Sequence, residues 1–242
     1  MDSGTRFGSF PRTDVSRLVA NPQRAGERTI VSREEVLARV RAALRGKKKA
    51  SEPSAPETYA RNGALGAEEK LLLLEERLSE YDARVFRCSE ADLGRQIADV
   101  LLSGGKSRMV HPLRVPAQWL DGRISWTPDS DDKTGRLSSA QIESLDGVLT
   151  AATVAVAESG SIVLQHGPKE GRRALTLLPD YHLCVLFAEQ VVETLPECFD
   201  RLRPNATRPT TFISGPSATA DIEMTRIKGV HGPRFLDVIL VS

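Results

Sequence analysis

The sequence has few cysteines, and they lie far apart. Only three occur, Cys88, Cys184 and Cys198, and no two of them form a Cys-x-x-Cys pair. An odd, scattered set does not build a disulfide framework and fits a reducing compartment. This chain alone therefore cannot hold a four-cysteine iron–sulphur cluster or zinc ribbon. Because His, Asp and Glu are also scattered, we predict no metal site and no cofactor in this chain.

Excess charge, aromatic side chains and long apolar runs are scarce as well. The 33 basic and 32 acidic residues nearly cancel, so nothing attracts the chain globally to nucleic acid or an anionic membrane. Aromatic residues make up 5% of the chain, which argues against base-stacking surfaces. Residues 1–14 lack the apolar core of a secretory signal, and no run approaches the roughly 20 apolar residues that span a bilayer. We expect a soluble, cytoplasmic protein.

The chain divides by composition into a short N-terminal extension and one large domain. Residues 1–31 are polar and predict a tail or strap lying over another surface. Ser32, with Glu35 three residues later, marks the start of a helix over 32–46. A linker rich in Lys, Pro and Ser follows at 47–66, and an α/β domain occupies 67–242.

Short apolar runs alternate with helical patterns along the large domain. In the first part we predict helices at 68–81 and 89–102, strands at 83–87 and 108–110, and a polar surface loop at 121–136. In the second part we predict strands at 145–156, 161–164, 174–178, 182–187, 210–214 and 235–241, and helices at 189–202 and 217–227. This alternation predicts a mostly parallel sheet with helices on both faces. Such sheets bind ligands beyond the carboxyl ends of their strands.

Two Gly-Pro turns near the carboxyl terminus bracket a segment dense in Ser, Thr, Asp and Glu. The first turn, Ser214-Gly215-Pro216-Ser217, follows a predicted strand and precedes a predicted helix. Its backbone N–H groups and the hydroxyls of Ser217 and Thr219 would form an anion pocket at the helix N-terminus. The alternative is plain helix capping by Ser217. Asp221 also belongs to the candidate site, although its charge would repel a nearby anion.

The second turn carries the candidate catalytic histidine. His231 stands between Gly229-Val230 and Gly232-Pro233, so the glycines allow the backbone close to a ligand and leave the imidazole free. Histidine transfers protons near neutral pH. The alternative is a histidine that bonds a carboxylate, such as that of Asp221, to hold the loop down. His182 begins a predicted strand and would face the same cleft, or would be a histidine at the edge of the core.

Four segments carry a resemblance to a known family. They read AESGSIVL at 157–164, RALTLLPDYHLCVL at 173–186, SGPSATADIEMT at 214–225 and GVHGPRFLDVILV at 229–241. In order and spacing they resemble the LUD-domain family, over roughly 145–242. The resemblance implies a fold similar to NagB/RpiA/CoA-transferase-like proteins. It also implies a role in oxidising L-lactate to pyruvate with separate iron–sulphur subunits. No catalytic residue of the family is carried over. Glu158 and Ser159 stand where members more usually have Asp and Thr.

The turn at Glu158 completes the set of candidate site residues. Glu158, Gly160 and Ser161 lie in a tight turn between apolar runs, and CoA transferases of the similar fold use a glutamate nucleophile in a comparable turn. The alternative is a carboxylate that accepts hydrogen bonds from the N–H groups of the turn.

Two functions remain open. The first is an accessory subunit of a lactate-oxidising system, which binds a small anion or the iron–sulphur partners, with the N-terminal strap on a partner. The second is an enzyme of the CoA-transferase or sugar-phosphate isomerase type, with Glu158 or His231 in the chemistry. A flavin or nicotinamide module is disfavoured, because no GxGxxG follows an early strand.

Overall fold

The computed structural model of the chain describes residues 32–45, 61–130, 132, 134–220, 226–228 and 232–242. The chain divides into two units, 1–57 and 58–242, which we describe separately. In the first unit, helix α1 (Arg33–Leu44) begins where predicted, because the Ser32 Oγ accepts a hydrogen bond of 3.2 Å from the Glu35 N–H. The Glu35 carboxylate pairs with Arg39 one turn later at 3.0 Å.

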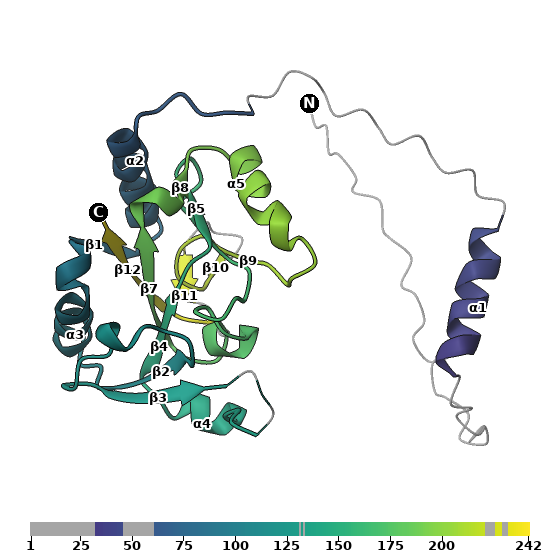
Figure 1. Cartoon of the computed structure of the whole chain (residues 1–242), viewed down its shortest axis with the longest axis horizontal. Coiled ribbons are helices and arrows are strands. Elements are labelled where there is room, and N and C mark those ends of the chain that lie inside the picture. Colours follow the sequence, from purple (N-terminus) through teal and green to yellow (C-terminus); the bar gives the residue numbers. More distant parts are fainter. Residues whose placement is uncertain (1–31, 46–60, 131, 133, 221–225, 229–231) are drawn as a thin grey trace, which may run out of the picture. The chain divides into compact units, whose positions relative to one another are not determined.

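A parallel sheet of six strands forms the centre of the described part of the second unit (Figure 1). Its spatial order is β1-β12-β7-β4-β2-β3, and each neighbouring pair is parallel. Strand β7 is apolar along almost its whole length and buried on both sides, as central parallel strands are. The strands are β1 (Arg84–Cys88), β2 (Arg108–Pro112), β3 (Ser125–Asp129), β4 (Gly147–Ala151), β7 (Tyr181–Phe187) and β12 (Phe235–Val241).

Alternate residues of the central strands enter two different cores. Leu183 and Val185 of β7 pack with helix α3 (Leu93–Ser103) on one face of the sheet. Cys184 and Leu186 of the same strand pack with helix α2 (Ala67–Glu80) on the other. The prediction of an α/β sheet with helices on both faces is therefore confirmed.

A second, four-stranded sheet shares the α2 face with helix α2, and the sequence did not predict it. Its order is β8-β5-β6-β9, with β5–β6 and β6–β9 antiparallel and β5–β8 parallel. Ala155 and Ile162 pack toward the main sheet, while Val154 and Val163 pack toward helix α5. The bounds are β5 (Val154–Val156), β6 (Ser161–Leu164), β8 (Val191–Val192), β9 (Thr211–Ile213) and α5 (Leu195–Leu202). The expectation of a single sheet was wrong, because apolar runs do not say which strands pair.

Three local predictions were also wrong. The helix at 217–227 is an antiparallel pair, β10 (Ala218–Ala220) with β11 (Arg226–Lys228); residues 221–225 between them lie outside the described residues. The strand at 174–178 is a 3₁₀ helix, Arg173–Thr176, because periodicity cannot tell a short buried turn from a buried strand. The surface loop at 121–136 contains β3, whose polar sequence reflects its place at the sheet edge.

The helix at 189–202 is shorter than predicted. Residues 188–192 instead form a 3₁₀ turn and strand β8, and α5 begins after the Thr194 cap. The remaining short helices are Glu90–Asp92, Ala117–Trp119, α4 (Ser139–Glu143) and Arg203–Asn205.

The strand order sets where the sheet opens. From β2 the chain moves outward to β3, whereas from β4 it moves the other way, through β7 to β12. Strands β2 and β4 are neighbours, so the connections beyond their carboxyl ends diverge. In open α/β sheets, this divergence creates a crevice at the carboxyl edge.

Candidate functional site

The predicted carboxyl-terminal motif lies beside a small hollow of about 200 Å³, which we call the amino-edge hollow. His182 and Leu236, the second residues of β7 and β12, form part of its wall and pair with each other in the sheet register. The two Gly-Pro turns, Ser214–Ser217 and Gly232–Pro233, also line the hollow. The hollow therefore lies at the amino ends of parallel strands, not beyond their carboxyl ends as expected.

The two Gly-Pro turns contact each other directly. Ser217 N–H donates to the Pro233 carbonyl oxygen at 2.7 Å. Gly215 and Gly232 have φ angles of +82° and +86°, a conformation that glycine adopts without strain. A Cβ atom on Gly215 would lie 2.4 Å from the Tyr81 Cβ, so glycine is also required there by packing.

Arg173 supplies the positive charge of the amino-edge hollow. It begins the 3₁₀ helix before β7, and its Nη1 donates to the Thr176 carbonyl at 2.8 Å and to the Thr176 Oγ1 at 3.0 Å. Among the residues that the structure describes, no carboxylate forms an ion pair with Arg173. Partial burial lowers the pKa of Arg173, yet a guanidinium remains charged at neutral pH.

His182 is a buried, neutral histidine that also reaches this hollow. Only 1% of its surface is exposed, and its Nε2 lies 2.8 Å from the Thr150 Oγ1 on β4. Burial, with a smaller contribution from the charge of Arg173, lowers the pKa of His182 to about 3. The imidazole is therefore uncharged at neutral pH. It can form a hydrogen bond with a ligand, but it does not supply positive charge.

A chain of hydroxyl groups joins the Ser161 turn to the hollow. Ser159 Oγ donates to Ser161 Oγ at 2.9 Å, and Ser161 Oγ lies 2.7 Å from the Oγ of Ser214 on the hollow's wall. Ser161 is thus one contact away from the hollow. Ser214 and Ser217 bring hydroxyls to the wall itself.

Glu158 and Gly160 lie elsewhere, although they belong to the same turn as Ser161. Glu158 is exposed, and its N–H donates to the Glu193 carbonyl at 3.1 Å. Gly160 has a φ of +58°, and a Cβ there would lie 2.8 Å from the Arg77 Cβ on helix α2. Neither residue lines the amino-edge hollow. The turn packs against α2.

Of the three remaining predicted site residues, only Thr219 belongs to the described part of the chain. Thr219 pairs with Ile227 in the β10–β11 hairpin. Asp221 and His231 lie outside the described residues. Because 218–220 form a strand, the helix N-terminus on which the anion pocket was predicted does not exist. The positive charge of Arg173 replaces it as the physical reason to expect an anion.

A larger cavity, of about 800 Å³, lies at the opposite end of the main sheet. Ala151 and Phe187, the last residues of β4 and β7, contribute to its wall, as does Arg114, two residues beyond β2. We call it the carboxyl-edge cavity. It lies where the connections from β2 and β4 diverge, which is where the fold itself predicts a ligand.

Sequence reasoning missed Arg173 and every residue of the carboxyl-edge cavity. Arg173 belongs to the segment RALTLLPDYHLCVL and directly precedes the strand predicted at 174–178, which does not form. The cavity residues come from several loops distant in sequence, so no motif joins them. The available signal was the rule that loops after neighbouring parallel strands meet.

The fold and its hollows define the class: an open parallel α/β sheet with ligand-sized spaces at both ends. The LUD domain matches residues 71–241, and the chain belongs to this family. A protein of Deinococcus radiodurans named lactate utilization protein C is 38% identical over 86% of this chain and 94% of its own length. One from an Exiguobacterium species, with the same name, is 29% identical over 88% of this chain and 97% of its own length.

A solved structure supports the same assignment. The crystal structure of a DUF162 family protein from Deinococcus radiodurans superposes with a TM-score of 0.64 at 36% identity. It covers 74% of this chain, and the whole of that protein is matched. In the ranges described here, no helix is both long and apolar enough to cross a membrane.

Proposed function

We propose that this protein is an accessory subunit of a cytoplasmic system that oxidises L-lactate to pyruvate. Two relatives matched over most of their length carry the name lactate utilization protein C, which supports a role in lactate utilisation. In this role the chain binds a small anion, the iron–sulphur partner subunits, or both. The clusters then belong to the partners.

The proposal that the chain binds a small anion rests on the presence of Arg173 in the amino-edge hollow. A cation that lines a hollow and has no described carboxylate partner attracts a negative ligand. Ser214 and Ser217 hydroxyls and the His182 imidazole provide hydrogen bonds around it. At about 200 Å³ the hollow is smaller than the sites of drug-sized ligands and suits a small carboxylate such as lactate or pyruvate.

The test is calorimetric titration of the full chain with L-lactate and with pyruvate. Arg173→Ala should weaken binding by at least tenfold, because a charged hydrogen bond contributes about 1.5 kcal/mol or more. Arg201→Ala, which removes an exposed charge from α5, is the matched control and should bind like the parent. Unchanged binding in Arg173→Ala would refute the anion role.

The partner part has a separate test. A tagged full chain, produced together with the iron–sulphur subunits, should purify with the broad visible absorption of their clusters. Removing residues 1–57, the first unit, should abolish this while leaving the lactate titration unchanged. A chain that purifies colourless, or that oxidises lactate alone, would contradict the accessory role.

The enzyme alternative gains no support from the described residues. It needs Glu158 or His231 beside a ligand, and Glu158 lines neither the amino-edge hollow nor the carboxyl-edge cavity.

A further inference from the structure

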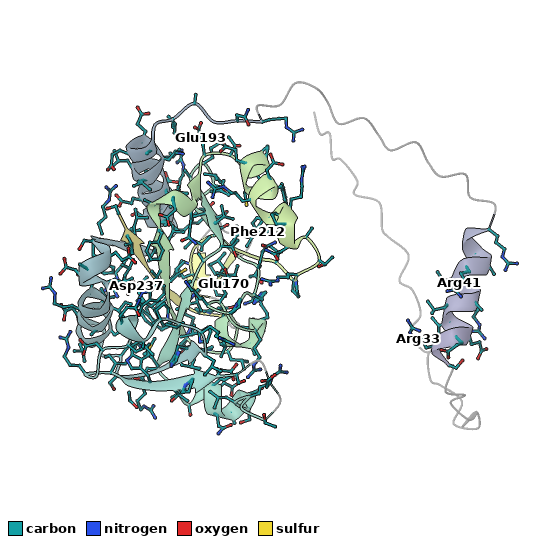
Figure 2. All side chains as sticks on the ribbon, in the orientation of Figure 1. Arg33, Arg41, Glu170, Glu193, Phe212 and Asp237 are labelled. Carbon is teal, nitrogen blue, oxygen red and sulfur yellow. The ribbon has the colours of Figure 1, made fainter. Side chains whose placement is uncertain are left out.

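The carboxyl-edge cavity is built around a buried carboxylate. Glu170 is 6% exposed and lies inside the second unit (Figure 2). It accepts a short hydrogen bond from the Thr153 hydroxyl and one of 3.1 Å from the Gly167 N–H. In the described ranges it has no cationic partner. A carboxylate has about four acceptor positions, so Glu170 keeps acceptor capacity on the cavity side.

Three cations share the cavity with this carboxylate, and none of them forms an ion pair with it. Arg114, Lys169 and Arg208 are exposed and line the cavity, and none forms an ion pair with a described residue. Arg208 and Glu170 both reach Gly167: a Cβ on Gly167 would lie 3.5 Å from Arg208 Nη1 and 3.9 Å from Glu170 Oε2. Three cations against Glu170 and Glu189 leave the cavity with a net positive charge, which favours an anion. Because the three cations are separate, each can pair with a different negative group of one ligand.

Hydrogen bonds connect the loops after β4 and β7 beneath the cavity. Gln190 Nε2 donates to the Ala152 carbonyl at 2.6 Å, while its Oε1 accepts from the Phe187 N–H at 2.8 Å. The Ala151 N–H donates to the Lys169 carbonyl at 3.0 Å. These bonds fix the floor of the cavity independently of the exposed side chains on its rim.

One wall of the cavity is aromatic. The rings of Trp119 and Phe187 lie 6.1 Å apart, centre to centre, and both residues line the space. Trp119 is one of the two tryptophans of the chain; the other, Trp126, is not part of this wall. We therefore expect a ligand in the cavity to change the fluorescence of Trp119.

We propose that the carboxyl-edge cavity is a second ligand site, for a hydroxyl-bearing organic anion with two or more negative charges. Lys169, Arg208 and Arg114 hold the charges, and Glu170 accepts a hydrogen bond from a ligand hydroxyl. At about 800 Å³ the space takes a ligand well above the size of lactate. The site stands independently of the role proposed for the amino-edge hollow.

The test titrates the full chain with citrate and with glucose 6-phosphate, which carry the shared chemistry on carboxylates and on a phosphate. Binding is followed by tryptophan fluorescence in a Trp126→Phe background and by calorimetry in the parent chain. At least one probe should bind saturably at millimolar concentration or below, whereas uncharged glucose should not. The probe that binds tells which anionic group the site prefers.

Variants separate this site from general charge attraction. Lys169→Ala/Arg208→Ala should weaken binding of that probe by at least tenfold. Arg95→Ala/Arg201→Ala removes the same charge from exposed positions on α3 and α5 and should leave binding unchanged. Glu170→Gln should weaken binding while the chain stays folded. Failure of both probes to bind, or equal loss in the two double variants, would overturn the proposal.

Discussion

The hollows at the two ends of the main sheet are formed in different ways. At the amino edge, glycines with positive φ and two contacting turns shape a hollow of about 200 Å³ around one cation. At the carboxyl edge, loops from three neighbouring strands leave a cavity of about 800 Å³ around a buried carboxylate. The first is marked by an unusual sequence motif, and the second by topology. A sequence motif therefore reveals a turn that needs glycine more readily than a site assembled from separate loops.

The largest loss of stability is expected for a substitution in the turns that line the amino-edge hollow. Gly215→Ala places a Cβ 2.4 Å from Tyr81 at a φ of +82°, so both overpacking and backbone strain act. We expect the free energy of unfolding to fall by about 3 kcal/mol. Gly105→Ala has a similar φ of +67° but meets no atom within 4 Å, and should cost about 1 kcal/mol. Urea denaturation measures both; equal losses would show that packing against Tyr81 is absent.

The next prediction concerns pH. The pKa of His182 is lowered to about 3 in the folded chain by burial and by Arg173, compared with about 6.5 when unfolded. Between these values the unfolded chain binds a proton that the folded chain does not. Stability should therefore fall as the pH drops below about 6.5, by about 2 kcal/mol at pH 5 from this residue.

The measurement is the free energy of unfolding at pH 7 and pH 5 in parent chain and His182→Gln. The glutamine keeps a hydrogen-bonding group near Thr150 but does not titrate. The loss on acidification should be smaller in the variant by about 2 kcal/mol. Parallel pH curves would show that His182 is already protonated, or accessible to water, in the folded state.

The smallest of the three losses of stability is expected at the carboxyl-edge cavity. Glu170→Ala deprives the Thr153 hydroxyl and the Gly167 N–H of their acceptor, which should lower stability by about 1.5 kcal/mol. Glu189→Ala removes an exposed acid from the same cavity and should change stability by less than about 0.5 kcal/mol. Chemical denaturation of both variants checks the difference. No loss in Glu170→Ala would contradict the hydrogen bonds that Glu170 accepts from Thr153 and Gly167.

The sequence predicted most strands that are buried on both faces of the sheet and most helices whose ends carry clear capping signals. Strand 235–241 was predicted with the bounds that β12 has, and helix 68–81 differs from α2 by one residue at each end. The edge strand β3 was missed because it is only partly buried and contains Pro128. The second sheet was missed because pairing is a property of tertiary packing, not of the local sequence.

The sequence predicted some of the residues that lie together in the candidate site, but not where in the fold they lie. Gly215, Ser217, Gly232 and His182 do meet around one hollow, because the turns carry their own conformational signal. Their location at the amino edge was not foreseen, since it depends on the order of β7 and β12 in the sheet. Asp129 illustrates the same limit: it was assigned to a surface loop, but it is buried and paired with Arg172 at 2.9 Å.

The most direct test of the account measures L-lactate binding in the parent chain, in Arg173→Ala and in Lys169→Ala/Arg208→Ala. We predict that the loss of at least tenfold occurs in Arg173→Ala alone, because only that change removes the cation of the amino-edge hollow. Lactate binding that survives in Arg173→Ala, or that disappears with the carboxyl-edge double variant, would contradict it.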